Sequence, residues 1–314
     1  MINIILCVFG YKDYIESTIR SLLCQTFQSF ELIIINDGCD YDLNSLINSI
    51  NDKRIKYYKN EKNIGFTASL IKGINFSKNQ YIAIHDAGNI AYPEKIELQY
   101  NYLEHNKNIF LVGTSVELID ENDQIICNII ANSDEDYIKK NLPFRNLFKH
   151  SSIMFRNDSN FNYRSKFKYA QDYDFYLNLL SKGKKLTNFK EVLLKERFLK
   201  NSISFAKKTE QDFYANIARK FYYERKNFGF DSYDVFKPQK EVSKSITFPS
   251  LNEYIYKIQK IHFLLFSMKL KDARLLIKEI LKEKWNPKLL ILFTISYFHF
   301  IVKFICKLKK LDYS

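Results

Sequence analysis

The stretch Tyr81-Ile82-Ala83-Ile84-His85-Asp86-Ala87-Gly88-Asn89-Ile90 decides the fold of this chain. Its apolar half predicts a buried strand that ends by delivering the carboxylate of Asp86 to a turn. An earlier apolar run, residues 30–36, breaks in the same way at Asp37 and Gly38. Ligands of open parallel sheets bind outside the carboxyl ends of the strands, so two acidic strand ends predict one shared site.

Around this stretch, short apolar runs alternate with helical patterns from residue 1 to about residue 115. The alternation predicts βαβ units and therefore an α/β fold. The predicted strands cover residues 2–9, 31–35, 55–59, 81–84 and 110–114, and the predicted helices cover residues 14–25, 43–50, 67–75 and 94–104. A hairpin over residues 116–130 is predicted to turn at Glu121-Asn122-Asp123.

From about residue 206 the pattern changes, because the apolar residues fall at helical spacing almost to the end of the chain. Amphipathic helices are predicted over residues 207–226, 251–269 and 272–284, with Pro249 and Pro287 between them. The sequence therefore predicts two domains, an α/β domain over residues 1–205 and a helical C-terminal region over residues 206–314.

The charge balance favours an anionic partner. The 314 residues include 48 Lys and Arg against 35 Asp and Glu, a net charge of +13. Such an excess suits a nucleoside diphosphate, a phospholipid surface or nucleic acid. No helix-turn-helix, zinc-finger or aromatic RNA-binding pattern is visible in the sequence, which argues against nucleic acid. A dinucleotide oxidoreductase is excluded, because the first turn reads Phe9-Gly10-Tyr11-Lys12 instead of Gly-x-Gly-x-x-Gly.

The cysteines and the N-terminal residues indicate a reducing compartment. The five cysteines are scattered, without the paired spacing of a zinc site or a disulfide framework. Met1 leads directly into the apolar residues 2–6, with no basic region and no small-residue cleavage site. This segment is predicted to be the first core strand rather than a signal peptide, so we expect a cytoplasmic protein.

A series of short segments follows in residues 1–205 with short gaps. In chain order they are Val8-Phe9-Gly10-Tyr11, residues 21–27, Ile35-Asn36-Asp37-Gly38, residues 60–65, Lys72-Gly73-Ile74, residues 81–89 with Pro93-Glu94-Lys95, residues 150–156, and Ala170-Gln171-Asp172-Tyr173-Asp174. Their order resembles that of the family 2 glycosyltransferases. The resemblance implies a GT-A nucleotide-sugar-binding domain, in which helices flank a Rossmann-like mixed sheet.

Enzymes of that family transfer a sugar from a nucleoside diphosphate to an acceptor hydroxyl, with inversion at the anomeric carbon. The resemblance implies this activity here, with UDP as the favoured nucleotide. The acceptor is then a glycan or a lipid-linked glycan in the synthesis of bacterial lipopolysaccharide, lipooligosaccharide or capsule. The chemistry needs a carboxylate that binds the base, a cation that neutralises the departing diphosphate, and a carboxylate that takes the acceptor proton.

By this resemblance, Asp37 falls where the family binds the nucleobase. The expected donor-nucleotide site consists of Phe9, Gly10, Asp37, Asn63, Gly65, Lys72 and Asp86. The residues alone leave a second role open for Asp37, because an Asp-Gly pair commonly closes a turn without binding anything.

Asp172 is the candidate general base, because the pair Gln171-Asp172 stands where the family has its catalytic acidic pair. Proton transfer to such a group is typically worth roughly 10²- to 10⁴-fold in rate. The helical run that follows also suits Asp172 as an N-cap, a compatible role. Three further residues resemble family positions near the diphosphate or the acceptor: His150, Arg156 and Arg197. The loop after Arg197 departs from the family, since Leu199 stands in the place of a histidine.

Asp86 matches the first acid of the metal-binding Asp-x-Asp motif, but Gly88 stands at the second acidic position and Asn89 follows it. A divalent ion prefers several oxygen ligands, including anionic ones. The resemblance implies Mn²⁺ or Mg²⁺, and three readings of the departure stay open. The affinity for metal is reduced, or His85, Asn89 and a remote carboxylate complete the ligand set, or basic side chains replace part of the metal's work. A catalytically weakened nucleotide-sugar-binding protein is the alternative function.

Residues 289–302 form an almost unbroken apolar run between Lys288 and Lys303. As a helix this run would span about 21 Å, short of the roughly 30 Å hydrocarbon core, so a transmembrane helix is not expected. One interpretation is an interfacial helix that makes a peripheral contact with the inner face of the cell membrane. The other is an ordinary core helix with a solvated basic tail.

Overall fold

The computed structural model describes residues 1–199, 207–238, 249–283, 286–298 and 301–302. Within them the chain divides into two compact units. The first comprises residues 1–116, 130–196 and the described part of 209–241. The second comprises residues 117–129 and the described parts of 197–208 and 242–314.

Parallel strands form one half of the sheet in the first unit. Their order is β3 (Ile55–Lys59), β2 (Phe30–Asn36), β1 (Ile2–Val8) and β4 (Tyr81–Asp86). The connections between them contain the helices α1 (Ile15–Leu23), α2 (Leu43–Ile50) and α3 (Phe66–Phe76). Parallel neighbours need crossover connections of this kind, so the predicted βαβ units are confirmed.

Beyond β4 the sheet continues with antiparallel pairings. The order is β8 (Met154–Arg156), β6 (Ile109–Ile119), β9 (Lys185–Arg197) and β5 (Ile90–Ala91), and β7 (Ile125–Ile129) pairs with β6. Strand β8 runs antiparallel to both β4 and β6. Over the described residues the result is one mixed sheet of nine strands, in agreement with the predicted α/β class.

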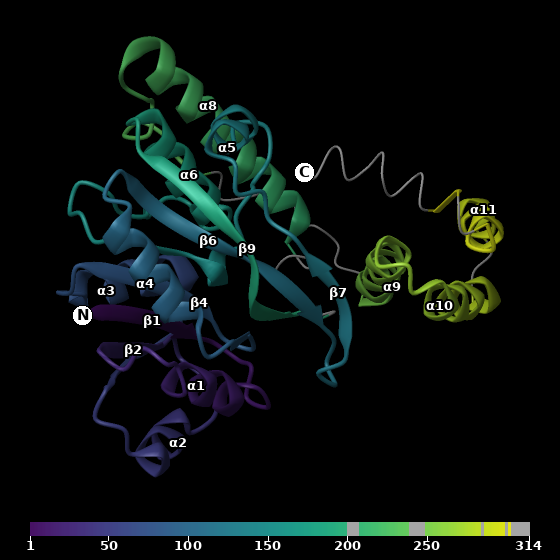
Figure 1. The fold of residues 1–314 in the computed structure, drawn as a ribbon, viewed down its shortest axis with the longest axis horizontal. Coiled ribbons are helices and arrows are strands. Elements are labelled where there is room, and N and C mark those ends of the chain that lie inside the picture. The colour runs from purple at the N-terminus through teal and green to yellow at the C-terminus, as the bar shows by residue number, and fades with distance from the viewer. Residues whose placement is uncertain (200–206, 239–248, 284–285, 299–300, 303–314) are drawn as a thin grey trace. The chain divides into compact units, whose positions relative to one another are not determined.

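Strand β1 is buried on both faces because its side chains alternate between two cores. Ile5 and Cys7 belong to one core, and Ile4 and Leu6 belong to the other. Helix α3 packs on the first core, while α1, α2 and α4 (Lys95–His105) pack on the second. Figure 1 shows α1 and α2 on one side of the β1–β2 layer and α3 on the other. Strands covered in this way can reach a ligand only at their ends.

The helices α5 (Glu135–Asn141), α6 (Gln171–Ser181) and α8 (Lys208–Phe228) complete the first unit, together with a 3₁₀ turn at His150–Ser152. Aromatic residues of α8, Tyr214, Phe221 and Tyr222, are buried in the same core as Ile5. Helix α8 therefore belongs to the first unit, although it follows the domain boundary that the sequence suggested at residue 205.

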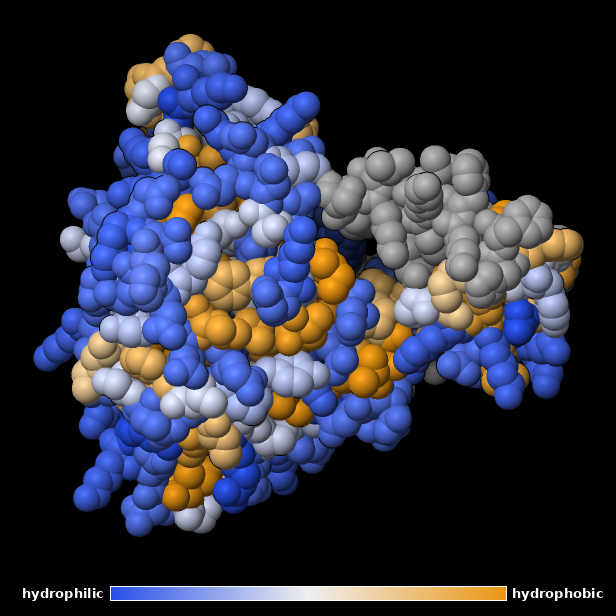
Figure 2. Space-filling model, in the orientation of Figure 1, coloured by the Kyte–Doolittle hydropathy of each residue, from blue (hydrophilic) through white to orange (hydrophobic). Residues whose placement is uncertain are grey.

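The second unit contains the turn of the β6–β7 hairpin and the helices α9 (Pro249–Phe266), α10 (Leu270–Glu283) and α11 (Pro287–Ile295). Its core includes Leu118, Ile126, Ile261, Ile277 and Leu289. Figure 2 shows hydrophobic side chains next to hydrophilic ones on the surface formed by α10 and α11. The apolar run at 289–302 is not one regular helix, because α11 ends at Ile295. No helix in the described residues is long and apolar enough to cross a membrane.

Candidate active site

Asp86 is the last residue of β4, and its backbone is held from the neighbouring 3₁₀ turn. Its amide donates a hydrogen bond of 2.9 Å to Ser151 Oγ. In the sheet, Asp86 lies opposite Cys7, which is near the carboxyl end of β1. Its side chain is 34% exposed, so the carboxylate can still reach a ligand.

A chain of polar groups leads from Asp86 into the protein. Asp86 Oδ1 lies 3.4 Å from His150 Nδ1, and His150 Nε2 lies 3.0 Å from the hydroxyl of Tyr163. Burial lowers the pKa of His150, but the contact with Asp86 and the charges of Asp86 and Asp172 outweigh it and raise the pKa above its ordinary value. Burial raises the pKa of Asp86, but His150, His85 and Lys95 outweigh it and lower the pKa. The pair therefore favours a carboxylate beside an imidazolium.

A second cation, Lys95, is fully buried behind this pair. Its Nζ donates a hydrogen bond of 2.8 Å to the carbonyl of Ser151. Burial lowers the pKa of Lys95 to about 7, against the opposing effect of Asp86. Burial also lowers the pKa of His85 to about 3, and its Nε2 lies 3.1 Å from the carbonyl oxygen of Asn89. His85 is thus a neutral structural residue below Asp86, not one that faces a ligand.

Asp172 lies in the first turn of α6, where the helix N-terminus favours a negative charge. The N-cap is Ala170, in the left-handed region at φ 52°, so the predicted capping role of Asp172 is wrong. Asn146 donates a hydrogen bond of 2.8 Å to Asp172 Oδ2. Two residues further on, Asp174 is buried and bound by Arg164, which fixes this turn of the helix.

Asp37 organises the loop that follows β3. Its Oδ1 accepts hydrogen bonds of 2.9 Å from Asn60 Nδ2 and from the amide of Ile64, and its Oδ2 accepts one of 3.0 Å from the amide of Gly65. Asn60 in turn accepts a hydrogen bond of 2.7 Å from Lys72 Nζ. Asp37, Gly65 and Lys72 therefore form one network, which Asn60 joins together.

The side of this network nearest β1 presents an aromatic ring to solvent. Phe9 follows β1 directly and is 57% exposed, and the preceding carbonyl of β1 accepts a hydrogen bond of 2.8 Å from the amide of Asp37. Gly10 has φ +75°, and its carbonyl accepts a hydrogen bond from Tyr41. Asn63 is exposed, and its backbone packs so closely on Gly38 that a Cβ there would lie 2.7 Å from the Asn63 nitrogen.

The structure brings the three acidic residues of the prediction into one electrostatic neighbourhood. Burial and then the charges of Asp86 and Asp37 raise the pKa of Cys7, which lies between the two strand ends. Burial and then the charges of Asp172 and Asp86 raise the pKa of Tyr163 well above its ordinary value. The charges of Asp86 and Asp37 thus act on Cys7, and those of Asp86 and Asp172 act on Tyr163.

Arg156 does not lie at this edge, and its placement near the diphosphate needs correction. It pairs with Tyr81 at the first residue of β4, about 16 Å along the strand from Asp86. Its guanidinium donates to the carbonyls of Leu103, Asn106 and Ile109 and to the Tyr81 hydroxyl. Arg156 therefore holds the end of α4.

Arg197 belongs to the second unit, not to the unit that contains Asp86. Its guanidinium donates a hydrogen bond of 3.0 Å to the carbonyl of Asp120 and one of 2.5 Å to Asp123 Oδ1. Its side chain is 1% exposed. The structure therefore assigns to Arg197 a contact with the hairpin turn, and its role beside the diphosphate stays a prediction. Leu199 also belongs to the second unit.

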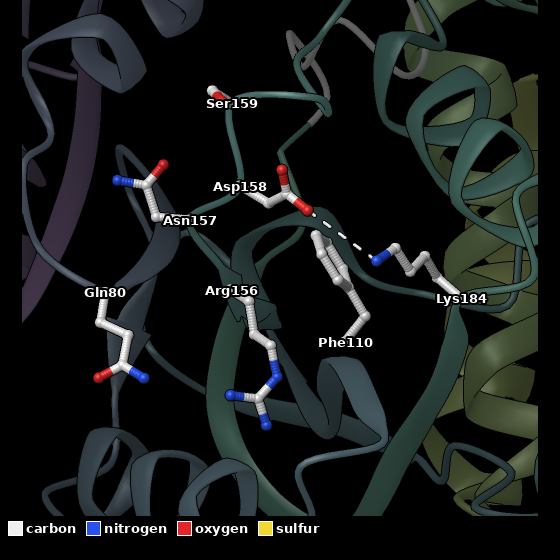
Figure 3. A pocket seen from close by; sticks show the side chains of 7 residues that line it. All are labelled: Gln80, Phe110, Arg156, Asn157, Asp158, Ser159 and Lys184. Carbon is white, nitrogen blue, oxygen red and sulfur yellow. Dashed lines mark ion pairs between the residues drawn. The ribbon is translucent and has the colours of Figure 1, made fainter.

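A pocket of about 450 Å³ lies at the amino end of β4, away from the acidic residues. Figure 3 shows its lining, with Arg156 extending away from the ion pair of Asp158 and Lys184. The Asp158–Lys184 separation is 3.9 Å, and Lys184 Nζ lies 5.1 Å from the centre of the Phe110 ring. The hollow and the candidate catalytic groups are thus at opposite ends of one strand.

The residues around Asp86 do not fit a resident divalent ion. Among the described residues, no group of three or more His, Cys, Asp or Glu side chains could hold one. Asp86 Oδ1 lies 3.4 Å from His150 Nδ1, so the histidine occupies one side of this carboxylate. Gly88 offers no ligand, and a Cβ at Gly88 would lie 2.8 Å from the ring of Tyr11.

Sequence reasoning missed several residues that shape this site. They are Tyr11, Asn60, Lys95, Asn146, Ser151 and Tyr163. Tyr11, Asn60, Lys95 and Ser151 stand in the motif segments, which is a usable signal. Asn146 and Tyr163 lie in irregular stretches without a pattern, so nothing in the sequence distinguishes them from ordinary loop residues.

Comparisons with known proteins identify the family of the chain. Residues 3–168 match the family described as glycosyl transferase family 2. An uncharacterized glycosyltransferase of Methanocaldococcus jannaschii is 30% identical over 236 residues, which cover 72% of this chain and 80% of that protein. The O-antigen biosynthesis glycosyltransferase WbnJ of Escherichia coli is 33% identical over 206 residues, covering 63% of this chain and 79% of WbnJ.

Solved structures with the same fold are also known. The crystal structure of S. aureus TarS in complex with UDP-GlcNAc matches with a TM-score of 0.56 over 88% of this chain and 86% of that chain. The sequence identity is 11%, so this likeness concerns the fold alone.

Proposed function

The chain belongs to glycosyl transferase family 2, a family of glycosyltransferases, and from that premise we propose that it transfers a sugar from a UDP sugar to an acceptor hydroxyl with inversion. The observation that carries this proposal is the position of Asp37 and Asp86 at the carboxyl ends of β2 and β4, which both pair with β1. Asp86 Oδ1 lies 3.4 Å from His150 Nδ1, and the charge of Asp172 acts on the same histidine. These groups match the needs of the reaction, which are base recognition, charge beside the diphosphate and removal of one proton.

Asp172 acts as the general base in this proposal. Its carboxylate takes the proton of the acceptor hydroxyl as the acceptor oxygen bonds to the anomeric carbon and the bond from that carbon to the diphosphate breaks. Attack from the side opposite the diphosphate inverts the configuration. Asn146 and the N-terminus of α6 hold the carboxylate in place.

Donor recognition is assigned to the Asp37 network and Phe9. A carboxylate offers about four acceptor directions, and three of those of Asp37 are used by the loop. The remaining one suits an N–H group of the base, and the exposed ring of Phe9 suits its face. The name of the TarS complex, which contains UDP-GlcNAc, supports UDP as the nucleotide.

His150 supplies positive charge beside the diphosphate in this proposal. The contact with Asp86 raises the pKa of His150 above its ordinary value, which favours the imidazolium, and Asp86 lies 3.4 Å from its Nδ1. Lys72, tethered to Asn60, is a second cation of the donor site. A protein cation can stabilise charge that develops on a leaving group, which is the largest single contribution in many enzymes.

The acceptor is proposed to be a bacterial surface glycan, which the O-antigen role in the name of WbnJ supports. We also propose that the second unit makes a peripheral contact with the membrane on its cytoplasmic side. Helix α11 exposes Leu290 and Ile291, at 45% and 59%, and Tyr297 and Phe298 just beyond it are also exposed. Apolar side chains next to lysines suit an interface of acyl chains and anionic headgroups.

The test is a panel of nucleotide sugars, incubated with the full chain with and without Mn²⁺, in which release of the nucleoside diphosphate is measured. We expect release from at least one UDP sugar and not from the corresponding GDP or dTDP sugars. Failure of every nucleotide sugar to bind or react would contradict the proposal.

A second function, nucleotide-sugar binding without turnover, is favoured by the loss of the second acid at Gly88. Tight binding of a UDP sugar without release, with several candidate acceptors present, would support this function instead. Release that depends on Asp172 would exclude it.

A further inference from the structure

The turn after β1 has an unusual backbone. Gly10 and Tyr11 follow one another with φ +75° and φ +58°. Glycine adopts such values freely, but a positive φ in a bulky residue such as tyrosine is a genuine outlier. The carbonyl of Tyr11 accepts hydrogen bonds from the amides of Tyr14 and Ile15, which start α1 and fix this conformation. Outliers of this kind persist where the surrounding structure enforces them, often at functional sites.

A second unusual turn faces it. Gly88, two residues after Asp86, has φ +93°. A Cβ at Gly88 would lie 2.8 Å from Tyr11 Cδ1 and 3.0 Å from Tyr11 Cε1, closer than real side chains approach. The two turns are neighbours because β1 and β4 pair in parallel, with Cys7 opposite Asp86. The ring of Tyr11 therefore covers the position from which a second acidic side chain would extend.

The phenol of Tyr11 packs on the turn that follows Asp86, with its ring against Gly88. A tyrosine hydroxyl is neutral at physiological pH, because its ordinary pKa is near 10. Tyr11 is half-buried, and no hydrogen bond from its hydroxyl is found within the described part of the chain. A neutral side chain thus covers the place where an Asp-x-Asp motif would add a second negative charge.

A neutral tyrosine in place of a second acidic side chain changes the electrostatics of a diphosphate site. Two carboxylates repel a diphosphate unless a divalent ion lies between them, because Mn²⁺ and Mg²⁺ depend on anionic oxygens. With one carboxylate, whose Oδ1 lies 3.4 Å from His150 Nδ1, the site lacks most of this repulsion. The diphosphate can then bind directly to protein groups.

We propose that Tyr11 takes the place of the second acidic ligand, forms the wall of the donor site beside Asp86, and makes binding of the nucleoside diphosphate independent of a divalent cation. This inference rests on the proposed function, because it concerns the donor of that same site. Tyr11 and Gly88 act as a matched pair, since the ring can lie over the turn only when residue 88 has no side chain.

The first experiment is a calorimetric titration of UDP into the full chain, once with EDTA and once with Mn²⁺. We expect the two dissociation constants to agree within about threefold. UDP affinity that rises by more than threefold with Mn²⁺ would overturn the inference. Absence of UDP binding in both conditions would instead count against the proposed function, so the two failures are distinguishable.

The second experiment uses a matched pair of double variants, Tyr11→Ala with Gly88→Asp and Tyr11→Ala with Gly88→Ala. Both remove the ring and both place a side chain at the same positive φ, so they share any backbone strain. Thermal melting of each variant establishes that it is folded. We expect Mn²⁺ to strengthen UDP binding by at least about tenfold in the Asp variant and to have no such effect in the Ala variant. A folded Asp variant without this gain would show that Tyr11 does not occupy the ligand position.

Discussion

The two ends of strand β4 differ in how their charged groups are satisfied. At the amino end, the guanidinium of Arg156 makes four hydrogen bonds, three of them to carbonyls, and Tyr81 is bound by both Arg156 and Glu104. At the carboxyl end, Asp86 and His150 are 3.4 Å apart and depend on each other for charge. The first arrangement is complete without a ligand, while the second leaves groups ready for one.

The pocket lies at the amino end, where the polar groups are already satisfied. Its volume of about 450 Å³ would suit a small molecule. Its lining, however, offers only the ion pair of Asp158 and Lys184 and a guanidinium that points elsewhere. The candidate site is therefore identified by the chemistry of its side chains and not by the position of the pocket.

The largest expected effect tests the carboxyl end directly. Asp172→Asn should lower the rate of sugar transfer by roughly 10²- to 10⁴-fold, because the amide cannot accept the acceptor proton. UDP affinity, measured by calorimetry, should stay unchanged since Asp172 is assigned to the acceptor side. Transfer at the wild-type rate would remove the general-base assignment.

A matched variant at the amino end serves as the control. Asp158→Asn also neutralises one carboxylate of the first unit, in a residue that forms an ion pair with Lys184 at 3.9 Å. It should leave the transfer rate unchanged. If both variants lost activity equally, the two ends of β4 would not differ in function.

The next largest effect concerns stability instead of activity. Arg156→Ala should lower the free energy of unfolding by about 2–4 kcal/mol, because it removes four hydrogen bonds and leaves the carbonyls of Leu103, Asn106 and Ile109 without this donor. The folded fraction should keep its UDP affinity and its transfer rate. Urea unfolding and calorimetry measure the two quantities separately, and a loss of UDP affinity without a loss of stability would return Arg156 to the donor site.

The sequence predicted the parallel half of the sheet well, for a physical reason. Apolar runs that end in Asp37 and Asp86 show both the buried strand and the edge where a ligand binds. The same reasoning placed Asp172 at a helix start, although it mistook Asp172 for the cap that Ala170 provides.

Arg156 could not be placed from the sequence. Order along the chain does not show which end of an antiparallel strand a residue occupies, and Arg156 is on β8, which runs opposite to β4. The packing of Tyr11 on Gly88 was equally invisible, since it joins two turns 77 residues apart through contacts that no periodicity encodes.

A smaller effect should appear in the pH dependence of stability. The pKa of His150 is raised in the folded state. Its contribution to the free energy of unfolding is therefore fully present below the unfolded pKa of about 6.5, and it is lost as the pH rises through the folded pKa. The pKa of Asp86 is lowered, so its contribution is present above about 3.8 and is lost as pH falls through the folded pKa. The pair therefore stabilises the fold most between these values.

His150→Gln should remove this contribution. Near pH 6 the free energy of unfolding of the wild type should exceed that of the variant by about 1 kcal/mol. The value is modest because a third of the Asp86 side chain is exposed and screened by solvent. The difference should shrink as the pH is raised toward 9, in urea unfolding at matched ionic strength. A difference that grows with pH would mean that His150 is neutral in the folded protein.

The smallest effect is expected at the pocket, and it is the sharpest test of the comparison. Lys184→Ala removes an ion pair of 3.9 Å and a cation that lies about 5 Å from the rings of Phe110 and Phe161. Such partly exposed contacts are worth about 0.5 kcal/mol, so the melting temperature should change little. UDP affinity should stay within about twofold of wild type, because the lysine lies at the opposite end of β4 from Asp86. If Lys184→Ala weakened UDP binding tenfold or more, the pocket would belong to the donor site, and the difference between the two strand ends would no longer identify where this protein works.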